Sequence, residues 1–196
     1  DRETMGGFRE FDLSFLDGEA RIEKPEMKPC GLYNAMIAPL VPYTVKGFLW
    51  YQGESNAWRA EQYGTLFPLL VEDWRSCWGR DFPFLFVQLA NFGARHDEPA
   101  ASQWAELREA QSEALHLDGT AMAVAIDIGE GDNIHPKNKQ ELGRRLALIA
   151  RARVYGESMA CSGPVYRTYR IEGDKIRIRF DEAEGLAVRD GRVLRG

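Results

Sequence analysis

The pattern of apolar and polar positions along the chain first predicts three strands. Residues 82–90 form a near-continuous apolar run of the kind found in strands that are buried on both faces of a parallel sheet. Residues 120–127 form a second apolar run, and an aromatic-rich run over residues 45–52 also has the length of a strand. Each run is followed by a polar segment, which marks the strand ends as the places where ligands would bind in an α/β sheet.

Helical periodicity occupies the segments between and after these runs. Apolar residues recur every three or four positions over residues 60–78, 102–115 and 138–154, which predicts a helix in each segment. Pro68 lies inside the first of these helices and should kink it or divide it in two. A further short helix is predicted over residues 32–40. Strand and helix thus alternate three times, and right-handed crossovers predict an α/β fold with a parallel sheet.

The period changes to two beyond Gly156. Residues 166–171 and 175–180 alternate between apolar and polar side chains, and Glu172-Gly173-Asp174 separates them, which predicts a β-hairpin. A second possible hairpin ends at Asp190-Gly191.

These patterns suggest three parts. Residues 1–30 are charged and irregular, and we expect them to be a lead-in or linker. Residues 31–157 would form the α/β domain. Residues 158–196 would supply the first strands of a small β-rich accessory module, in a chain that we expect to be cut at both ends.

Composition narrows the functional classes. The chain has 196 residues, a net charge of −5 and scattered basic residues, so nucleic acid is not an expected partner. It contains no run of 18 apolar residues, so membrane insertion is not expected either. Its three cysteines show no C-x-x-C spacing, which indicates neither a disulfide framework nor a zinc site. No metal or other cofactor is expected.

The segment after the apolar run 120–127 carries the strongest chemical signal. Asp132 and His135 stand three residues apart in a glycine-punctuated turn, and the chain has only three histidines. At this spacing a carboxylate can accept a hydrogen bond from one imidazole nitrogen while the other nitrogen faces a substrate. This is the base and its orienting acid in a serine hydrolase triad.

Two interpretations of the nucleophile compete. In the first, Gly53-Glu54-Ser55-Asn56-Ala57 is a nucleophile elbow with Ser55 as the attacking group, because it approximates G-x-S-x-G between a strand and a helix. Ala57 replaces the second glycine of that motif. The acid and the base of an elbow hydrolase also come from separate loops, whereas Asp132 and His135 share one.

The second interpretation rests on a resemblance. Residues 50–57, Trp-Tyr-Gln-Gly-Glu-Ser-Asn-Ala, resemble the W-x-Q-G-E-S-N block of the sialate O-acetylesterase family, carbohydrate esterases of the SGNH (GDSL-like) hydrolase superfamily. Asp132-x-x-His135 resembles the last block of that family. The resemblance extends through residues 32–40, 86–92 and 104–111, and so covers most of residues 30–155.

The resemblance implies a flavodoxin-like three-layer α/β/α fold with a parallel sheet and a Ser-His-Asp esterase acting on acetylated carbohydrate. It also implies a nucleophilic serine in an early G-Q-S-N-type block. No such block occurs in these 196 residues, so we expect the serine to lie before Asp1 and this chain to carry the C-terminal part of the domain. His135 would be the general base and Asp132 its partner. A periplasmic or secreted location is the one such a resemblance suggests.

The remaining site residues follow from the same comparison. The side-chain amide of Gln52 or the backbone N–H of Gly53 could face the oxyanion. Glu54 is either a second acidic partner of His135 or holds the loop by accepting backbone hydrogen bonds. Asn56 is either a further donor or a helix cap, and Ser55 would then be structural.

Two residues of the loop after residues 82–90 are weaker candidates for substrate binding. Arg95 could pair with the carboxylate of a sialic acid through its two-pronged guanidinium. His96 could contact a sugar from the same loop.

Overall fold

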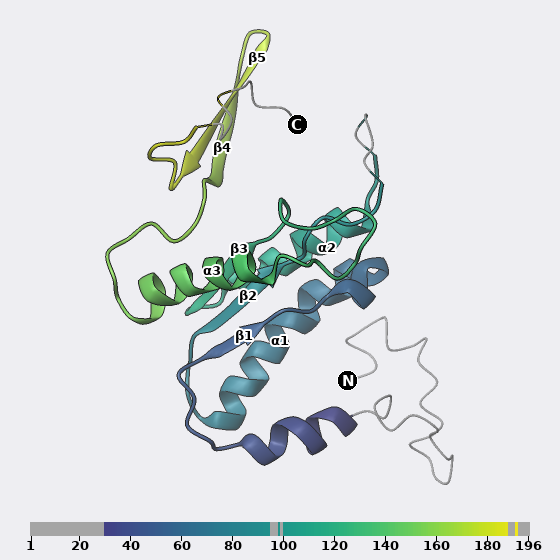
Figure 1. Ribbon diagram of the computed structural model, residues 1–196, viewed down its shortest axis with the longest axis vertical. Helices are drawn as coiled ribbons and strands as arrows, with labels where there is room; N and C mark the ends of the chain where they lie inside the picture. Colours follow the sequence, from purple (N-terminus) through teal and green to yellow (C-terminus); the bar gives the residue numbers. More distant parts are fainter. Residues whose placement is uncertain (1–29, 95–97, 99, 188–190, 192–196) are drawn as a thin grey trace.

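The computed structural model describes residues 30–94, 98, 100–187 and 191 of the 196. Three strands and three helices alternate along the chain (Figure 1). They are β1 (Phe48–Trp50), α1 (Ala60–Trp78), β2 (Phe84–Gln88), α2 (Gln103–Ser112), β3 (Thr120–Val124) and α3 (Lys139–Ile149). The strands form one parallel sheet in the order β1-β2-β3, so the predicted α/β class and alternation are confirmed.

The central strand β2 is covered on both faces, as its apolar run predicted. Phe84 and Phe86 belong to a core cluster that contains residues of α1 and α2. Leu85 lies in a different cluster with Ala123 and Ile149 of α3, on the opposite face of the sheet. The helices therefore form two outer layers around the sheet, and Figure 1 shows α1 and α3 flanking it.

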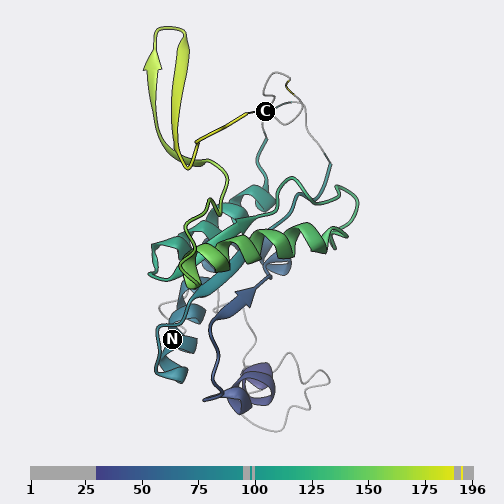
Figure 2. The ribbon, with the colours of Figure 1, turned by 60° about the vertical axis from the view of Figure 1, so that its left-hand side comes forward.

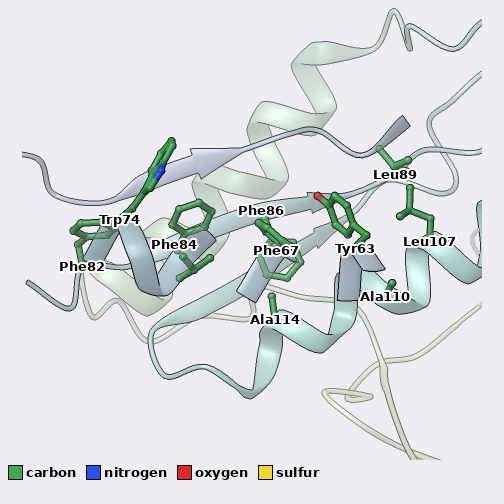
Figure 3. Packing of buried hydrophobic residues seen from close by; sticks show 11 residues of the cluster. Tyr63, Phe67, Trp74, Phe82, Phe84, Phe86, Leu89, Leu107, Ala110 and Ala114 are labelled. Carbon is green, nitrogen blue, oxygen red and sulfur yellow. The ribbon is translucent and has the colours of Figure 1, made fainter. Parts of the chain in front are cut away.

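Aromatic rings fill the layer between the sheet and helices α1 and α2 (Figure 3). The Phe67 and Phe86 rings meet edge to face with centroids 5.0 Å apart, and Phe48 meets Trp74 at 4.9 Å. Each such pair contributes about 0.5–1.5 kcal/mol beyond the burial of its apolar area. This packing supports the carboxyl ends of β1 and β2 from the side of α1 and α2.

Helix α1 is continuous from Ala60 to Trp78, so the prediction that Pro68 divides it is wrong. A proline inside a helix costs about 3 kcal/mol because it removes one hydrogen bond and crowds the preceding turn. Burial of a full apolar stripe outweighs that cost. The stripe comprises Tyr63, Phe67, Val71 and Trp74. The helix ends at Gly79, whose φ of 63° suits a glycine cap.

The shorter helical segments agree with the sequence patterns. The predicted helix over residues 32–40 is present as two consecutive turns, Tyr33–Ile37 and Ala38–Leu40. Helix α3 continues into a wider turn, Ala150–Val154, which completes the predicted segment. In the described part of the chain, no helix combines the length and the apolar character needed to cross a membrane.

The predicted hairpin is present as β4 (Val165–Glu172) and β5 (Lys175–Asp181), which pair antiparallel around Gly173. It forms a sheet of its own and extends away from the three-stranded sheet (Figures 1 and 2). The division into three parts stays a prediction, because residues 1–29 and most of the last nine residues lie outside the described part. Asp190 of the second possible hairpin also lies there.

Candidate active site

Three loops leave the carboxyl ends of β1, β2 and β3 at one edge of the sheet. They cover residues 51–56, 89–93 and 125–135. The second and third loops are in direct contact, because the Gly93 N–H donates to the Gly131 carbonyl at 2.9 Å. The first loop reaches the segment after the third, since the Nζ of Lys139 in α3 lies 4.6 Å from the centre of the Tyr51 ring. Parallel strands thus bring residues 50–57 and residues 132–135, the two segments that resemble blocks of the esterase family, to the same edge of the sheet.

Gln52, two residues beyond β1, has both ends of its side-chain amide engaged. Its Nε2 donates to Asn56 Oδ1 at 2.8 Å, and its Oε1 lies 3.2 Å from the Tyr63 hydroxyl. The same hydroxyl lies 3.2 Å from the Gln52 backbone carbonyl. The contact orients the Asn56 amide, because the accepting oxygen leaves Nδ2 as the donor. Among the described residues, Asn56 Nδ2 has no partner.

Gly53 is buried at the point where the chain turns away from the sheet, and its φ is 148°. A Cβ at this position would lie 3.1 Å from Gln111 Nε2 and 3.3 Å from Leu107 Cδ2. Both the backbone conformation and the lack of space therefore require glycine. The Gly53 carbonyl accepts from the Asn56 N–H at 2.8 Å, which starts a 3₁₀ helix over Glu54–Arg59.

Neither Ser55 nor Asn56 caps a helix. The 3₁₀ helix has Gly53 as its N-cap, α1 has Arg59, and no side chain caps either start. The capping alternative for Asn56 is therefore wrong, because the extra 3₁₀ turn moves the start of α1 four residues beyond it. Ser55 is exposed on that turn.

Glu54 is half-buried and acts electrostatically on two tyrosines. Burial raises the pKa of Tyr51, and the negative charge of Glu54 raises that pKa further. Burial also raises the pKa of Tyr63, with a smaller contribution from Glu54, while hydrogen bonds with Trp50 and Gln111 oppose it. In the described part of the chain the Glu54 carboxylate accepts no backbone hydrogen bond. No contact there supports the predicted role of Glu54 in stabilising the loop.

Asp132 and His135 are both exposed on the loop after β3. Within the described residues their side chains are not hydrogen-bonded to each other. The loop itself is braced, because the His135 N–H donates to Asn133 Oδ1 at 2.9 Å. Asn133 Nδ2 in turn donates to Glu130 Oε2 at 3.3 Å. The backbone that carries the candidate base is therefore held, while the two side chains are accessible.

The start of this loop presses against Asn91 in the loop after β2. A Cβ at Gly129 would lie 2.5 Å from the Asn91 backbone oxygen and 2.6 Å from Asn91 Oδ1, which leaves room only for glycine. The Asn91 Oδ1 atom is buried, and among the residues that the structure describes it has no hydrogen-bond partner. A buried acceptor without a partner is uncommon and frequently belongs to a functional site. The two loops are therefore fitted closely to each other.

Sequence reasoning missed three residues that shape this edge of the sheet. They are Tyr63, Asn91 and Gln111. Tyr63 occupied an apolar helix position and gave no polar signal. Gln111 could have been noticed, since a glutamine on the apolar side of a helix must find partners when it is buried.

Arg95 and His96 lie outside the described residues. Phe92, earlier in the same loop, is exposed and packs on Trp104 with ring centroids 5.2 Å apart. The Trp104 Nε1 donates to the Ala90 carbonyl at 2.7 Å, which fixes this aromatic pair next to the loop after β2.

A charged hollow of about 820 Å³ lies behind the loop after β3. Its charged side chains are paired: Arg145 donates to both carboxylate oxygens of Asp127, at 2.5 and 2.7 Å, and to Glu141 at 3.0 Å. Hydrogen bonds from Arg144 and Arg145 lower the pKa of Glu141 to about 2. This network fixes α3 to the end of β3 and so supports the loop between them.

Comparison with known proteins gives a consistent match. Residues 18–151 match the model of a family described as carbohydrate esterase, sialic acid-specific acetylesterase. Mouse sialate O-acetylesterase is 34% identical over 185 residues, which covers 83% of this chain and 34% of that protein. Human sialate O-acetylesterase is 37% identical over 154 residues, 68% of this chain and 29% of that protein.

A solved structure also resembles this chain. A crystal structure described as that of a novel carbohydrate acetylesterase from Xanthomonas citri is 48% identical in sequence, with a TM-score of 0.71. The match covers 76% of this chain and 35% of that one. The chain spans about a third of the length of the curated relatives it matches.

Proposed function

This chain belongs to the sialic acid-specific acetylesterase family of carbohydrate esterases, and from this premise we propose that it supplies the base, the acid and the oxyanion donors of a serine esterase. The proposed enzyme removes O-acetyl groups from sialic acid or another sugar. The observation that carries the proposal is that two loops, residues 51–56 and 125–135, leave the carboxyl ends of β1 and β3 at one edge of a parallel sheet, where Tyr51 contacts Lys139 just beyond the second loop. A base and an oxyanion site must face the same reacting carbon, and this edge allows it.

His135 is the proposed general base. It takes the proton from the attacking serine and returns it to the sugar oxygen when that oxygen leaves, a role that contributes about 10²–10⁴-fold to the rate. A water molecule then hydrolyses the acetyl-enzyme with the same help. Asp132 accepts a hydrogen bond from the second imidazole nitrogen and stabilises the imidazolium. The proposal needs these side chains to turn toward each other, and catalytic hydrogen bonds commonly tighten only when substrate binds.

The oxyanion donors in this proposal are the backbone N–H of Gly53 and the Nδ2 of Asn56. Gln52 is the less suitable donor, because its amide is already bound to Asn56 and Tyr63. Loss of one oxyanion donor typically costs about 3–4 kcal/mol of transition-state stabilisation. Glu54 stays a candidate second acid for His135.

The nucleophile is proposed to be a serine outside these 196 residues, since they contain no G-Q-S-N block and the similar Gly53-Glu54-Ser55-Asn56 belongs to the W-x-Q-G-E-S-N block. The alternative, Ser55, has little structural support. An elbow holds its serine in a strained turn, whereas the described non-glycine residues with positive φ are Cys30 and Glu182. The mechanism requires no metal or cofactor.

The proposed activity is tested by acetate release from O-acetylated sialic acid and from an acetylated xylo-oligosaccharide, using the full-length product of the encoding gene. His135→Ala should reduce the rate by at least about 10²-fold. His116→Ala is the matched control, because His116 is exposed on a turn before β3 and should leave the rate unchanged. Sugar binding without acetate release by the unmodified protein would instead favour a non-catalytic carbohydrate-binding role.

A further inference from the structure

Gln111, near the end of α2, is the polar side chain buried in the core of the described residues, with 1% of its surface exposed. Its Oε1 accepts from the Leu89 N–H at 2.9 Å. Its Nε2 donates to the Val87 carbonyl at 3.3 Å and to the Gln52 carbonyl at 3.1 Å. One side-chain amide therefore joins the end of β2 to the loop after β1.

The strand register explains why this amide is needed. Trp50 pairs with Phe86, so continuing the register by two residues would place Gln52 opposite Gln88. In a parallel ladder the backbone at that position would donate to the carbonyl of Val87 and accept from the N–H of Leu89. The chain has turned away there at Gly53, and the Gln111 amide makes both bonds in place of the absent strand backbone.

The bonds made by the Gln111 side chain also determine the orientation of the peptide bond between Gln52 and Gly53. The Gln52 carbonyl accepts from Gln111 Nε2 and from the Tyr63 hydroxyl, both of which lie in the core layer. The peptide bond between Gln52 and Gly53 is trans, so its N–H points opposite to its carbonyl. Holding the carbonyl toward the core therefore turns the Gly53 N–H away from it. In the described part of the chain, that N–H donates to no other group.

We infer that Gln111 is a positioning residue of the esterase site, which aims the Gly53 N–H at the oxyanion by holding the Gln52 carbonyl from the core side. The inference rests on the proposed function. Gln111 does not touch the reacting atoms, and its effect passes through one peptide plane. Tyr63 assists by donating to the same carbonyl.

The kinetic test uses Gln111→Met in the full-length gene product. The quantity measured is kcat for the hydrolysis of an aryl acetate, divided by the fraction of the protein that a fluorophosphonate can label. This ratio is the kcat per labelled site. Methionine keeps the length and volume of glutamine and removes the amide. The kcat per labelled site should fall by about 10–10²-fold while KM changes by less than about threefold, because the donor acts in the transition state. Gln103→Met, at the exposed start of the same helix, is the control and should leave kcat unchanged.

A structural role alone would lower the melting temperature and the labelled fraction while leaving kcat per labelled site unchanged, and that result would overturn the inference. Tyr63→Phe decides the matter if Gln111→Met does not fold, because it removes the hydroxyl that contacts the Gln52 carbonyl, and with it the contacts to Gln52 Oε1 and Trp50 Nε1, with little change of shape. It should lower kcat per labelled site by about 3–10-fold. An unchanged value would contradict the inference.

A crystal structure of the Gln111→Met or Tyr63→Phe protein separates this inference from the proposed function. The peptide between Gln52 and Gly53 should be rotated relative to the unmodified protein. An unchanged peptide would overturn the positioning role even in a protein that proves to have no esterase activity. If the unmodified protein releases no acetate, the proposed function is refuted. The rotation of the peptide between Gln52 and Gly53 then decides by itself whether Gln111 positions that peptide.

Discussion

The ammonium group of Lys139 lies over the ring of Tyr51, 4.6 Å from its centre. Lys139 begins α3, directly after the loop that carries Asp132 and His135, and Tyr51 directly follows β1. This contact joins the proposed base segment to the proposed oxyanion segment, although 88 positions separate them in the sequence. A cation over an aromatic face is attracted by the negative potential of the ring.

The Lys139–Tyr51 contact should be measurable as a coupling energy. Lys139 is exposed, so the interaction is expected to contribute about 0.5–1 kcal/mol. A double-mutant cycle of Lys139→Met and Tyr51→Leu, followed by urea unfolding, measures it. Additive effects of the two substitutions would show that the contact does not stabilise the protein.

Two glycine substitutions should have opposite effects. Gly129→Ala places a methyl group against the backbone oxygen of Asn91, so the loop must shift, at a cost of about 1–3 kcal/mol in unfolding free energy and a lower acetate-release rate. Gly143→Ala is the matched control in α3, where, among the described residues, no atom outside the two neighbouring residues and the nearby helix backbone lies within 4 Å of the added carbon. It should raise the unfolding free energy by about 0.5–1 kcal/mol. Equal effects of the two would contradict the close fit of the loops.

Asn56→Asp tests the second oxyanion donor. The aspartate keeps an acceptor for Gln52 Nε2 but replaces the Nδ2 donor with a negatively charged oxygen that repels the oxyanion. The kcat should fall by at least about 10²-fold, with little change in KM or in melting temperature. Asn34→Ala, on the exposed first helical turn, serves as the control. A kcat within about twofold of that of the unmodified protein would show that Asn56 is not an oxyanion donor.

Glu141 should make unfolding depend on acid pH. Its hydrogen bonds with Arg144 and Arg145 lower its pKa from an ordinary 4.5 to about 2 in the folded protein. A carboxyl whose folded pKa is lowered adds stability above the unfolded pKa, and this stability is lost as the pH falls from 4.5 toward 2. Thermal unfolding between pH 6 and pH 2.5 should show a steeper fall for the unmodified protein than for Glu141→Gln. Parallel curves would contradict the assignment.

The fold was largely predictable because the apolar pattern and the burial agree. The run at residues 82–90 contains β2, which is covered by helices on both faces, and such a strand needs apolar residues at successive positions. The continuity of α1 through Pro68 was not predictable, since local propensity does not report the packing of the Tyr63–Trp74 stripe.

For the candidate site, the sequence predicts residue types but does not predict their geometry. The spacing of Asp132 and His135 placed both on one loop, but it does not fix two side-chain rotamers, and their hydrogen bond is not formed in the described structure. The part played by Gln111 depends on the register between β1 and β2 and on where β1 ends. Neither quantity can be obtained from residue order alone.

The most direct test is to label the full-length gene product with a fluorophosphonate and to map the modified peptide, with His135→Ala and His116→Ala in parallel. We expect an adduct on a serine outside these 196 residues, which His135→Ala abolishes and His116→Ala retains. An adduct on Ser55 would make this chain an elbow hydrolase and contradict the proposed site. Labelling that is retained in the His135→Ala protein would show that His135 is not the general base.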